Sequence, residues 1–487
     1  MSNTTQALSR IEAILDDSSF VEIGAAVTAR ATDFNMQEKK APSDGVITGY
    51  GVINGNLVYV YSQDAAVLGG TIGEMHAKKI ANLYEKAMKM GAPVIGLIDC
   101  AGLRLQEATD ALDGFGQIYK NMSLASGIVP QITAVYGECG GGLAVLAELS
   151  DFVFVEEKKA KLFVNSPNAL DGNYESKLDT SSAEFMAKAG VADFIGDEET
   201  IANGVRQLVS MLPSNNEEGA VYTDNQDDLN RVCADMSAEI ADAALALTDI
   251  SDDGLFVEVK AEYAKEMVTG FIQLDGVTVG AVANRTAIYD ENGEKAEEFA
   301  AVLTTDGAYK AAEFVTFCNA FEIQEASIIP MLALTNVKGF EANVRAEKTI
   351  AKAAAKLVYA FSNADVPKVN VITGEAYGSA YVAMNSKSVG ADMVYAWSQA
   401  SIGMMDASLA AKIMYADEIA AADDVTAKIN EKASEYAALQ SSVEQAAARG
   451  YVDTIINPED TRKYIIAAFE MLFDKREVRA DKKHGTV

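Results

Sequence analysis

The stretch Val129-Pro-Gln-Ile-Thr-Ala-Val-Tyr-Gly-Glu-Cys-Gly-Gly141 decides the fold, because the chain contains a second version of it. The second version is Val366-Pro-Lys-Val-Asn-Val-Ile-Thr-Gly-Glu-Ala-Tyr-Gly378, in which every residue number is higher by 237. In each version a short apolar run rich in β-branched residues leads directly into glycines, a pattern that predicts a strand ending in a tight turn. Similarity at this separation indicates an internal duplication.

A second pair of segments, upstream in each half, supports the duplication. Phe20-Val-Glu-Ile followed by Val46 to Gly55 recurs as Phe256-Val-Glu-Val followed by Met267 to Gly276. Both longer segments end on Asn-Gly or Asp-Gly after an apolar run, the signature of a β-hairpin. Each half then alternates short apolar runs with helical patterns. We therefore expect an α/β fold with two tandem domains of β-β-α units.

Length and composition bound the domains and the class of function. The 487 residues exceed one ordinary core, and Pro213 to Asn230 is rich in breakers and acids, as in an exposed connection. We place the two domains at 1–235 and 236–487. No apolar run approaches the roughly 20 residues that cross a bilayer, and the N-terminus lacks a secretory signal, so a cytoplasmic protein without membrane insertion is expected. The net charge of −31 argues against nucleic-acid partners.

The chain has few residues for side-chain catalysis. His76 and His484 are its two histidines, which excludes most catalytic triads and histidine metal sites. The four cysteines, Cys100, Cys139, Cys233 and Cys318, form no C-x-x-C pair, so reduced thiols and no metal site are expected.

The two glycine turns offer chemistry without titrating groups. Gly140-Gly141-Gly142 precedes an apolar helical stretch, and Gly378-Ser379-Ala380 precedes another. Small residues at a strand-to-helix turn let a ligand approach amide N–H groups that have no helical acceptor. Such amides can hold an oxyanion, and one donor is worth about 3 to 4 kcal/mol in the transition state. A plain tight turn is the alternative, since no phosphate-binding glycine motif is present.

Eight segments, in order, resemble the carboxyltransferase subunits of propionyl-CoA and related acyl-CoA carboxylases and the α subunits of methylmalonyl-CoA decarboxylases. They begin at Asp44, Gly69, Gly91, Ala125, Leu212, Ala376, Gly450 and Lys482, and include Gly69-Gly-Thr-Ile-Gly-Glu-Met-His76 and Ala376-Tyr-Gly-Ser-Ala-Tyr381. The resemblance spans nearly the whole chain.

The resemblance implies two crotonase-like domains per chain, with acyl-CoA bound by the first and biotin by the second. It implies catalytic amides at Gly141 and Gly142 for the thioester and at Ser379 and Ala380 for the ureido oxygen of biotin. The implied binding residues are Gly102, Gly140, Gly378, Tyr381 and Val382. A ring-shaped homo-hexamer, a biotin carboxyl carrier protein, and a biotin carboxylase or membrane decarboxylase subunit are the implied partners.

Departures from the family pattern concern the acyl side. Ala101 and Leu103 stand in Asp99-Cys-Ala-Gly-Leu-Arg104, where the family usually has Gly and Ala. Val382 stands where carboxylases have an aspartate beside the acyl chain. The reaction type is therefore better defined than the acyl group or the direction.

Other features have competing interpretations. Ala87-Met88-Lys89-Met90 matches the sequence in which carriers present biotinyl-lysine, but it continues a helical face begun at Ile80, so we expect biotin on a separate protein. The pairs Lys39-Lys40 and Lys78-Lys79 either meet coenzyme A phosphates or are solvated. Glu107 is either an acid or base or a helix cap. A biotin-independent hydratase, isomerase or hydrolase using Glu107 or Glu138, and a non-catalytic acyl-CoA scaffold, remain alternatives.

Overall fold

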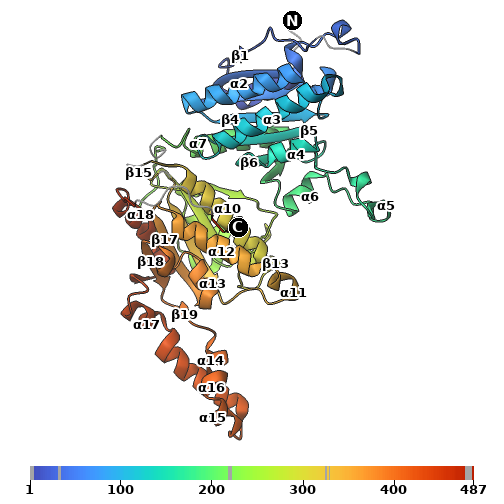
Figure 1. Cartoon of the computed structure of the whole chain (residues 1–487). Coiled ribbons are helices and arrows are strands. Elements are labelled where there is room, and N and C mark those ends of the chain that lie inside the picture. The colour runs from blue at the N-terminus through green and yellow to red at the C-terminus, as the bar shows by residue number, and fades with distance from the viewer. Residues whose placement is uncertain are drawn as a thin grey trace. The chain divides into compact units, whose positions relative to one another are not determined.

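Two similar mixed sheets organise the chain (Figure 1). In this computed structural model, residues 5–30, 34–217, 222–323, 326–327, 329–477 and 485–486 are described. One sheet lies in a unit formed by Met1–Glu218 and Lys260–Tyr263, and the other lies in a unit formed by Gly219–Val259 and Ala264–Val487. We call them unit 1 and unit 2.

The sheet of unit 1 begins with an antiparallel hairpin and continues as a parallel sheet. Its spatial order is β1 (Val21–Ile23), β2 (Val46–Ile53), β3 (Asn56–Gln63), β4 (Val94–Cys100), β5 (Gln131–Gly140), β6 (Phe152–Glu156) and β8 (Phe194–Gly196), with β7 (Lys161–Phe163) paired to β5.

The sheet of unit 2 repeats this plan strand for strand. Its order is β9 (Phe256–Val259), β10 (Met267–Leu274), β11 (Val277–Asn284), β16 (Met331–Val337), β17 (Lys368–Tyr377), β18 (Met393–Trp397) and β20 (Thr454–Ile456), with β19 (Ser401–Gly403) paired to β17. Unit 2 also has two separate two-stranded sheets, β12 (Ala287–Tyr289) with β13 (Lys295–Glu298) and β14 (Glu322–Ile323) with β15 (Ala326–Ser327). The shared strand order confirms the predicted duplication and the α/β class.

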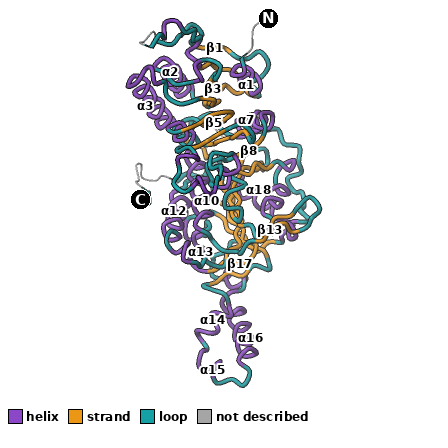
Figure 2. Tube along the Cα trace, turned by 90° about the vertical axis from the view of Figure 1, so that its right-hand side faces the viewer, coloured by secondary structure: helices purple, strands orange, loops and turns teal. Residues whose placement is uncertain are grey.

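Helices cover both faces of each sheet (Figure 2). In unit 1, α2 (Glu74–Met90) and α3 (Ala108–Ala125) pack together on one face, and α1 (Gln6–Ile14) and α7 (Glu198–Met211) lie on the other. In unit 2, α10 (Thr305–Ala320) and α12 (Ile350–Asn363) correspond to the first pair, and α9 (Ala243–Ile250) and α18 (Thr461–Met471) to the second. The shorter helices are α4 (Gly142–Ala147), α5 (Asn173–Ser176), α6 (Ala183–Lys188), α8 (Met236–Glu239), α11 (Val344–Glu347), α13 (Gly378–Ala383) and α17 (Val443–Ala448).

A helical arm extends from unit 2 (Figures 1 and 2). It consists of α14 (Ala407–Met414), α15 (Ala416–Ala420) and α16 (Val425–Tyr436), and α14 packs along α16. A π-helical turn, Ala437–Ser441, continues α16 and returns the chain to the sheet at β19. The arm has no equivalent among the described helices of unit 1.

Local sequence explains the two hairpins. Asn54 and Gly55 between β2 and β3 have φ values of 48° and 84°, and Asp275 and Gly276 between β10 and β11 have 52° and 72°. Two successive positive φ values define the turn that suits the twist of a two-residue hairpin, and Asn-Gly and Asp-Gly adopt it at low cost. The predicted hairpins are confirmed.

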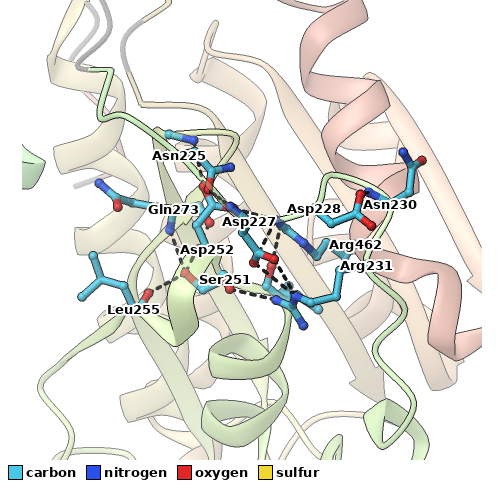
Figure 3. Close-up of polar contacts among 12 residues, drawn as sticks. Asn225, Asp227, Asp228, Asn230, Arg231, Ser251, Asp252, Leu255, Gln273 and Arg462 are labelled. Carbon is cyan, nitrogen blue, oxygen red and sulfur yellow. Dashed lines mark hydrogen bonds and ion pairs between the residues drawn. The ribbon is translucent and has the colours of Figure 1, made fainter.

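The connection between the halves is anchored to unit 2 (Figure 3). Most of residues 222–230 are exposed, as expected, but the Asp227 carboxylate accepts hydrogen bonds from Arg231 and from the fully buried Arg462 of α18. Arg462 also donates to Asp252 at 2.7 Å and to the carbonyl oxygen of Ile250. Residues 218–221 lie outside the described part. The linker composition therefore predicted exposure correctly and missed this buried anchor.

Candidate active site

The first glycine turn joins β5 to α4. β5 runs parallel to β4 and β6 in its first part, and after an irregularity in the register it pairs with β7. Gly141 follows with φ +64° and ψ −125°, a conformation that L side chains rarely adopt. Its own N–H donates to the carbonyl oxygen of Phe163 at 2.8 Å. The donors without a helical acceptor therefore begin at Gly142, the first residue of α4.

Two aromatic side chains of α3 shape the first turn. The Tyr119 hydroxyl donates to the carbonyl oxygen of Gly142 at 2.5 Å. A Cβ added at Gly142 would lie 2.6 Å from Cε1 of Phe115 and 2.9 Å from the Tyr119 oxygen. Only glycine fits here, although Gly142 itself is exposed. Sequence reasoning missed both aromatic residues, and their spacing of four positions on a helix was the available signal.

The second turn also contains a glycine with positive φ. Gly378, with φ +62°, begins α13 directly after β17. Ser379 is exposed, Ala380 is buried, and the Tyr381 side chain is half-buried, where burial raises its pKa to about 12. The carbonyl oxygen of Met404 lies 3.1 Å from the position of a Cβ on Gly378.

The shared form makes the equivalence of the turns more definite. Gly378 is the counterpart of Gly141, both by residue number and by its positive φ. By the same offset of 237, Ser379 and Ala380 correspond to Gly142 and Leu143. The Gly141 N–H is bonded to the Phe163 carbonyl oxygen, whereas Gly142 and Leu143 lie in the first turn of α4.

The loop after β4 carries Gly102, which has φ +106° and open space around its Cα. The loop is bonded to the segment before α2, since the Ile72 N–H donates to the Gly102 carbonyl and the Arg104 N–H donates to the Ile72 carbonyl. Asp99, at the end of β4, pairs with the buried Arg10 at 3.0 Å. The predicted binding residue Gly102 thus lies in a loop with a fixed path.

A buried ionic cluster holds this loop. The Arg104 guanidinium donates to Asp44 at 2.5 Å and to Glu107 at 2.8 Å, and all three side chains are essentially inaccessible. The second Glu107 oxygen accepts the Glu74 N–H at the start of α2, at 2.7 Å. Both oxygens of Glu107 therefore have structural partners, which confirms its interpretation as a cap and ion-pair partner. Glu138 is exposed on β5.

His76 belongs to the same cluster. Its Nδ1 lies 2.9 Å from the Asp44 carbonyl oxygen and its Nε2 lies 3.1 Å from the Gln63 side-chain nitrogen, so Nδ1 donates and Nε2 accepts. Burial, with a contribution from Arg104, lowers the pKa of His76 to about 3. The neutral ring is structural. His484 lies outside the described residues.

The lysines that the sequence singled out differ in their exposure and in their partners. Lys89 is exposed in the last turn of α2, which confirms that Ala87-Met88-Lys89-Met90 is helical and not a hairpin tip. Lys79 is buried and donates to Ser43 and to the Val46 carbonyl. The predictions that Lys79 is solvated or contacts a coenzyme A phosphate are therefore both wrong. Lys78 pairs with Glu74. Lys39 and Lys40 are exposed.

Other classes of site find little support in the described ranges. There, no three His, Cys, Asp or Glu side chains gather in a way that could hold a metal ion. No helix within those ranges is long and apolar enough to cross a membrane. The four cysteines are buried free thiols, and burial raises the pKa of Cys100 to about 12.

Known proteins share this architecture over its full length. The carboxyl transferase domain family matches residues 2–487. The α subunit of methylmalonyl-CoA decarboxylase from Propionigenium modestum is 38% identical over 99% of this chain and 92% of its own length. The propionyl-CoA carboxylase β chain of Roseobacter denitrificans is 38% identical over 99% and 93%.

A solved structure agrees with these sequence matches. A crystal structure of the transcarboxylase 12S hexamer, with hydrolysed methylmalonyl-coenzyme A bound, has a TM-score of 0.89 and 36% identity, covering 98% of this chain and 92% of that one. The chain therefore belongs to the carboxyltransferase family, whose members move a carboxyl group between biotin and an acyl-CoA in biotin-dependent carboxylases and decarboxylases.

Proposed function

We propose that each of the two glycine turns holds one of the two oxygens on which charge develops during carboxyl transfer. The first holds the thioester oxygen of an acyl-CoA, and the second holds the ureido oxygen of biotin. The observation that carries this proposal is the equivalence of the turns, each a strand-to-helix turn with a glycine near φ +60° in a duplicated sheet. Carboxyl transfer needs two oxygens to be stabilised as charge moves between biotin and the acyl-CoA. A duplicated chain offers two sets of amide donors for this purpose.

The first turn suits a thioester. Gly142 and Leu143 supply amide donors, and a ligand can approach because no atom lies within 4 Å of the position of a Cβ on Gly141. The bond from Tyr119 to the Gly142 carbonyl fixes the peptide plane next to these donors. Charge that develops on the thioester oxygen when the α-carbon loses its proton or its carboxyl group is then stabilised by fixed dipoles.

The second turn suits the ureido oxygen of biotin. Ser379 and Ala380 lie in the first turn of α13, where helix geometry leaves amide donors without acceptors. The exposure of Ser379 leaves the turn open to a ligand carried by another protein. When bound, biotin supplies the ureido nitrogen that carries the carboxyl group. The chain's part is to hold the ureido oxygen and to favour negative charge on it.

The relatives suggest the substrate class and the partners. Their names specify methylmalonyl-CoA or propionyl-CoA, so a short acyl-CoA of this kind is the proposed substrate. Lys89 is part of a helix, which supports biotin on a separate carrier. By analogy with the 12S hexamer, we propose that the chain forms a homo-hexamer. By analogy with the decarboxylase α subunit, we propose a cytoplasmic complex with a biotin carrier and with a carboxylase or membrane decarboxylase subunit.

The alternatives differ in which side chain they need. A biotin-independent hydratase would need a free carboxylate, and of the two candidates Glu107 is fully engaged by Arg104 and the start of α2. Glu138 is the remaining one. A scaffold protein would need neither turn.

The test is turnover of methylmalonyl-CoA by the purified chain with and without free biotin, followed by chromatography of the acyl-CoA products. We expect consumption that rises with biotin, persists in Glu138→Gln and is lost in Ser379→Trp. Consumption that ignores biotin, or that disappears in Glu138→Gln, would contradict the proposal. Biotin-dependent turnover that survives Ser379→Trp would leave the carboxyltransferase activity in place but remove the second turn from it.

A further inference from the structure

Just before each glycine turn, an aromatic residue and a glycine lie opposite each other on paired strands, and the two halves place them on opposite strands. In unit 1, Gly140 of β5 lies opposite Phe163 of β7, and a Cβ on Gly140 would lie 2.8 Å from the Phe163 ring. In unit 2, Tyr377 of β17 lies opposite Gly403 of β19. Each pair thus contains one aromatic ring and one glycine, but the two have changed strands. In unit 1 the Phe163 ring lies over Gly140, whereas in unit 2 a Cβ on Gly403 would meet Ser441, with the Ser441 Oγ at 2.8 Å.

The exchange gives the second turn a hydrogen bond that a phenylalanine cannot make. The buried Tyr377 hydroxyl donates to the Ser401 hydroxyl oxygen at 2.9 Å, and the Ser401 hydroxyl donates to the carbonyl oxygen of Ser441 at 3.1 Å. Tyr377 immediately precedes Gly378. A relay of two hydrogen bonds therefore runs from the turn, across β19, to the end of the π-helical turn Ala437–Ser441.

Both ends of the helical arm reach this turn. The chain enters the arm past the turn, where the Met404 carbonyl faces Gly378. It leaves the arm through the π-helical turn, whose Ser441 accepts the relay and packs against Gly403. π-Helical turns are rare and frequently occur at functional sites. Unit 1 has no such arm among its described helices, and Phe163 has no hydroxyl.

We propose that Tyr377, acting through Ser401, is a positioning residue that fixes the second turn to the base of the arm. Its hydroxyl sets where the strand ends and hence where the Ser379 and Ala380 amides point. The inference rests on the proposed function, because it assigns the second turn to biotin.

The test compares the Michaelis constants of the two substrates in the full chain. Tyr377→Phe and Ser401→Ala each break the relay and keep the fold's apolar contacts. One such bond corresponds to about a five- to tenfold effect. We expect the KM for free biotin to rise by about this factor, with the KM for methylmalonyl-CoA unchanged. The double variant should match the single variants, because both break the same relay.

Two controls separate positioning from general stability. Tyr395→Phe removes a hydroxyl from a buried tyrosine of neighbouring β18, and Ser441→Ala removes a buried hydroxyl that has no hydrogen-bond partner among the described residues. Ser441→Ala leaves the accepting carbonyl in place. Both controls should leave the KM for biotin unchanged.

The outcomes distinguish the inference from the proposed function. An unchanged KM for biotin in Tyr377→Phe, in a protein whose Ser379→Trp variant has lost biotin-dependent turnover, overturns the inference alone. Equal changes in both Michaelis constants, or additive effects in the double variant, overturn it as well. A wild-type protein indifferent to biotin overturns both the inference and the function on which it rests.

Discussion

Replacing Arg104 by methionine should destabilise unit 1 strongly. Arg104 lies between Asp44 and Glu107, and all three side chains are at most 1% exposed. Methionine keeps the approximate length and removes the charge, so two carboxylates would stay buried without their cation. Breaking a buried ion pair by removing one partner costs about 3 to 5 kcal/mol. We expect a loss of this size in the free energy of unfolding at pH 7.5.

The loss should depend on pH in a defined direction. Burial already raises the pKa of Asp44, and Arg104 opposes that effect. Without Arg104 the folded-state pKa of Asp44 rises further, so Asp44 stabilises the fold only while protonated, and that contribution disappears as the pH rises. The difference between wild type and Arg104→Met should therefore be smaller at pH 5.5 than at pH 7.5.

The assay is urea unfolding at both pH values, followed by far-UV circular dichroism. Arg30→Met is the matched control, since Arg30 also pairs with two carboxylates but is 39% exposed. Water screens such pairs, and the control should show a far smaller loss. Equal losses in the two variants, or a loss that grows as the pH falls, would refute the reasoning.

Three further predictions concern single positions. Gly141→Ala should cost about 1 to 2 kcal/mol of stability from its φ of +64° alone, because its Cβ would meet no atom, and thermal unfolding measures the cost; a neutral substitution would contradict the turn geometry. His76→Gln should flatten the fall in stability between pH 7 and pH 5. The folded-state pKa of His76 is lowered to about 3, so the contribution of His76 to stability is lost as the pH falls below about 6.5, where the unfolded chain binds a proton. An unchanged pH profile would count against a buried neutral ring. The chain incubated with a biotin ligase, biotin and ATP should remain unlabelled on a streptavidin blot, since Lys89 is helical, and labelling at Lys89 would show that the chain is its own carrier.

Features encoded over a few residues were predictable from the sequence. The Asn54-Gly55 and Asp275-Gly276 turns have a local cause, since only a few residue types accept positive φ. The glycine turns were predictable for the same reason, and their repetition revealed the tandem fold.

Contacts between distant segments were not predictable in this way. Arg104 looked like any loop arginine, and its burial depends on Asp44 and on the start of α2. The Phe163 carbonyl oxygen accepts a hydrogen bond from the Gly141 N–H because β7 pairs with β5, and composition does not indicate this pairing. The sequence therefore located the first turn but did not indicate that the Gly141 N–H is bonded to Phe163.

The central claim is that the first turn binds the acyl-CoA and the second does not. Calorimetric titration of methylmalonyl-CoA into wild type, Gly142→Trp and Ser379→Trp tests it most directly. Gly142 has no room for a side chain beside Phe115, so we expect binding at least tenfold weaker in Gly142→Trp. The Kd of Ser379→Trp for methylmalonyl-CoA should stay within about twofold of the wild-type value, which corresponds to a change in binding free energy of at most about 0.4 kcal/mol. Acyl-CoA binding that is lost in Ser379→Trp and kept in Gly142→Trp would contradict the account.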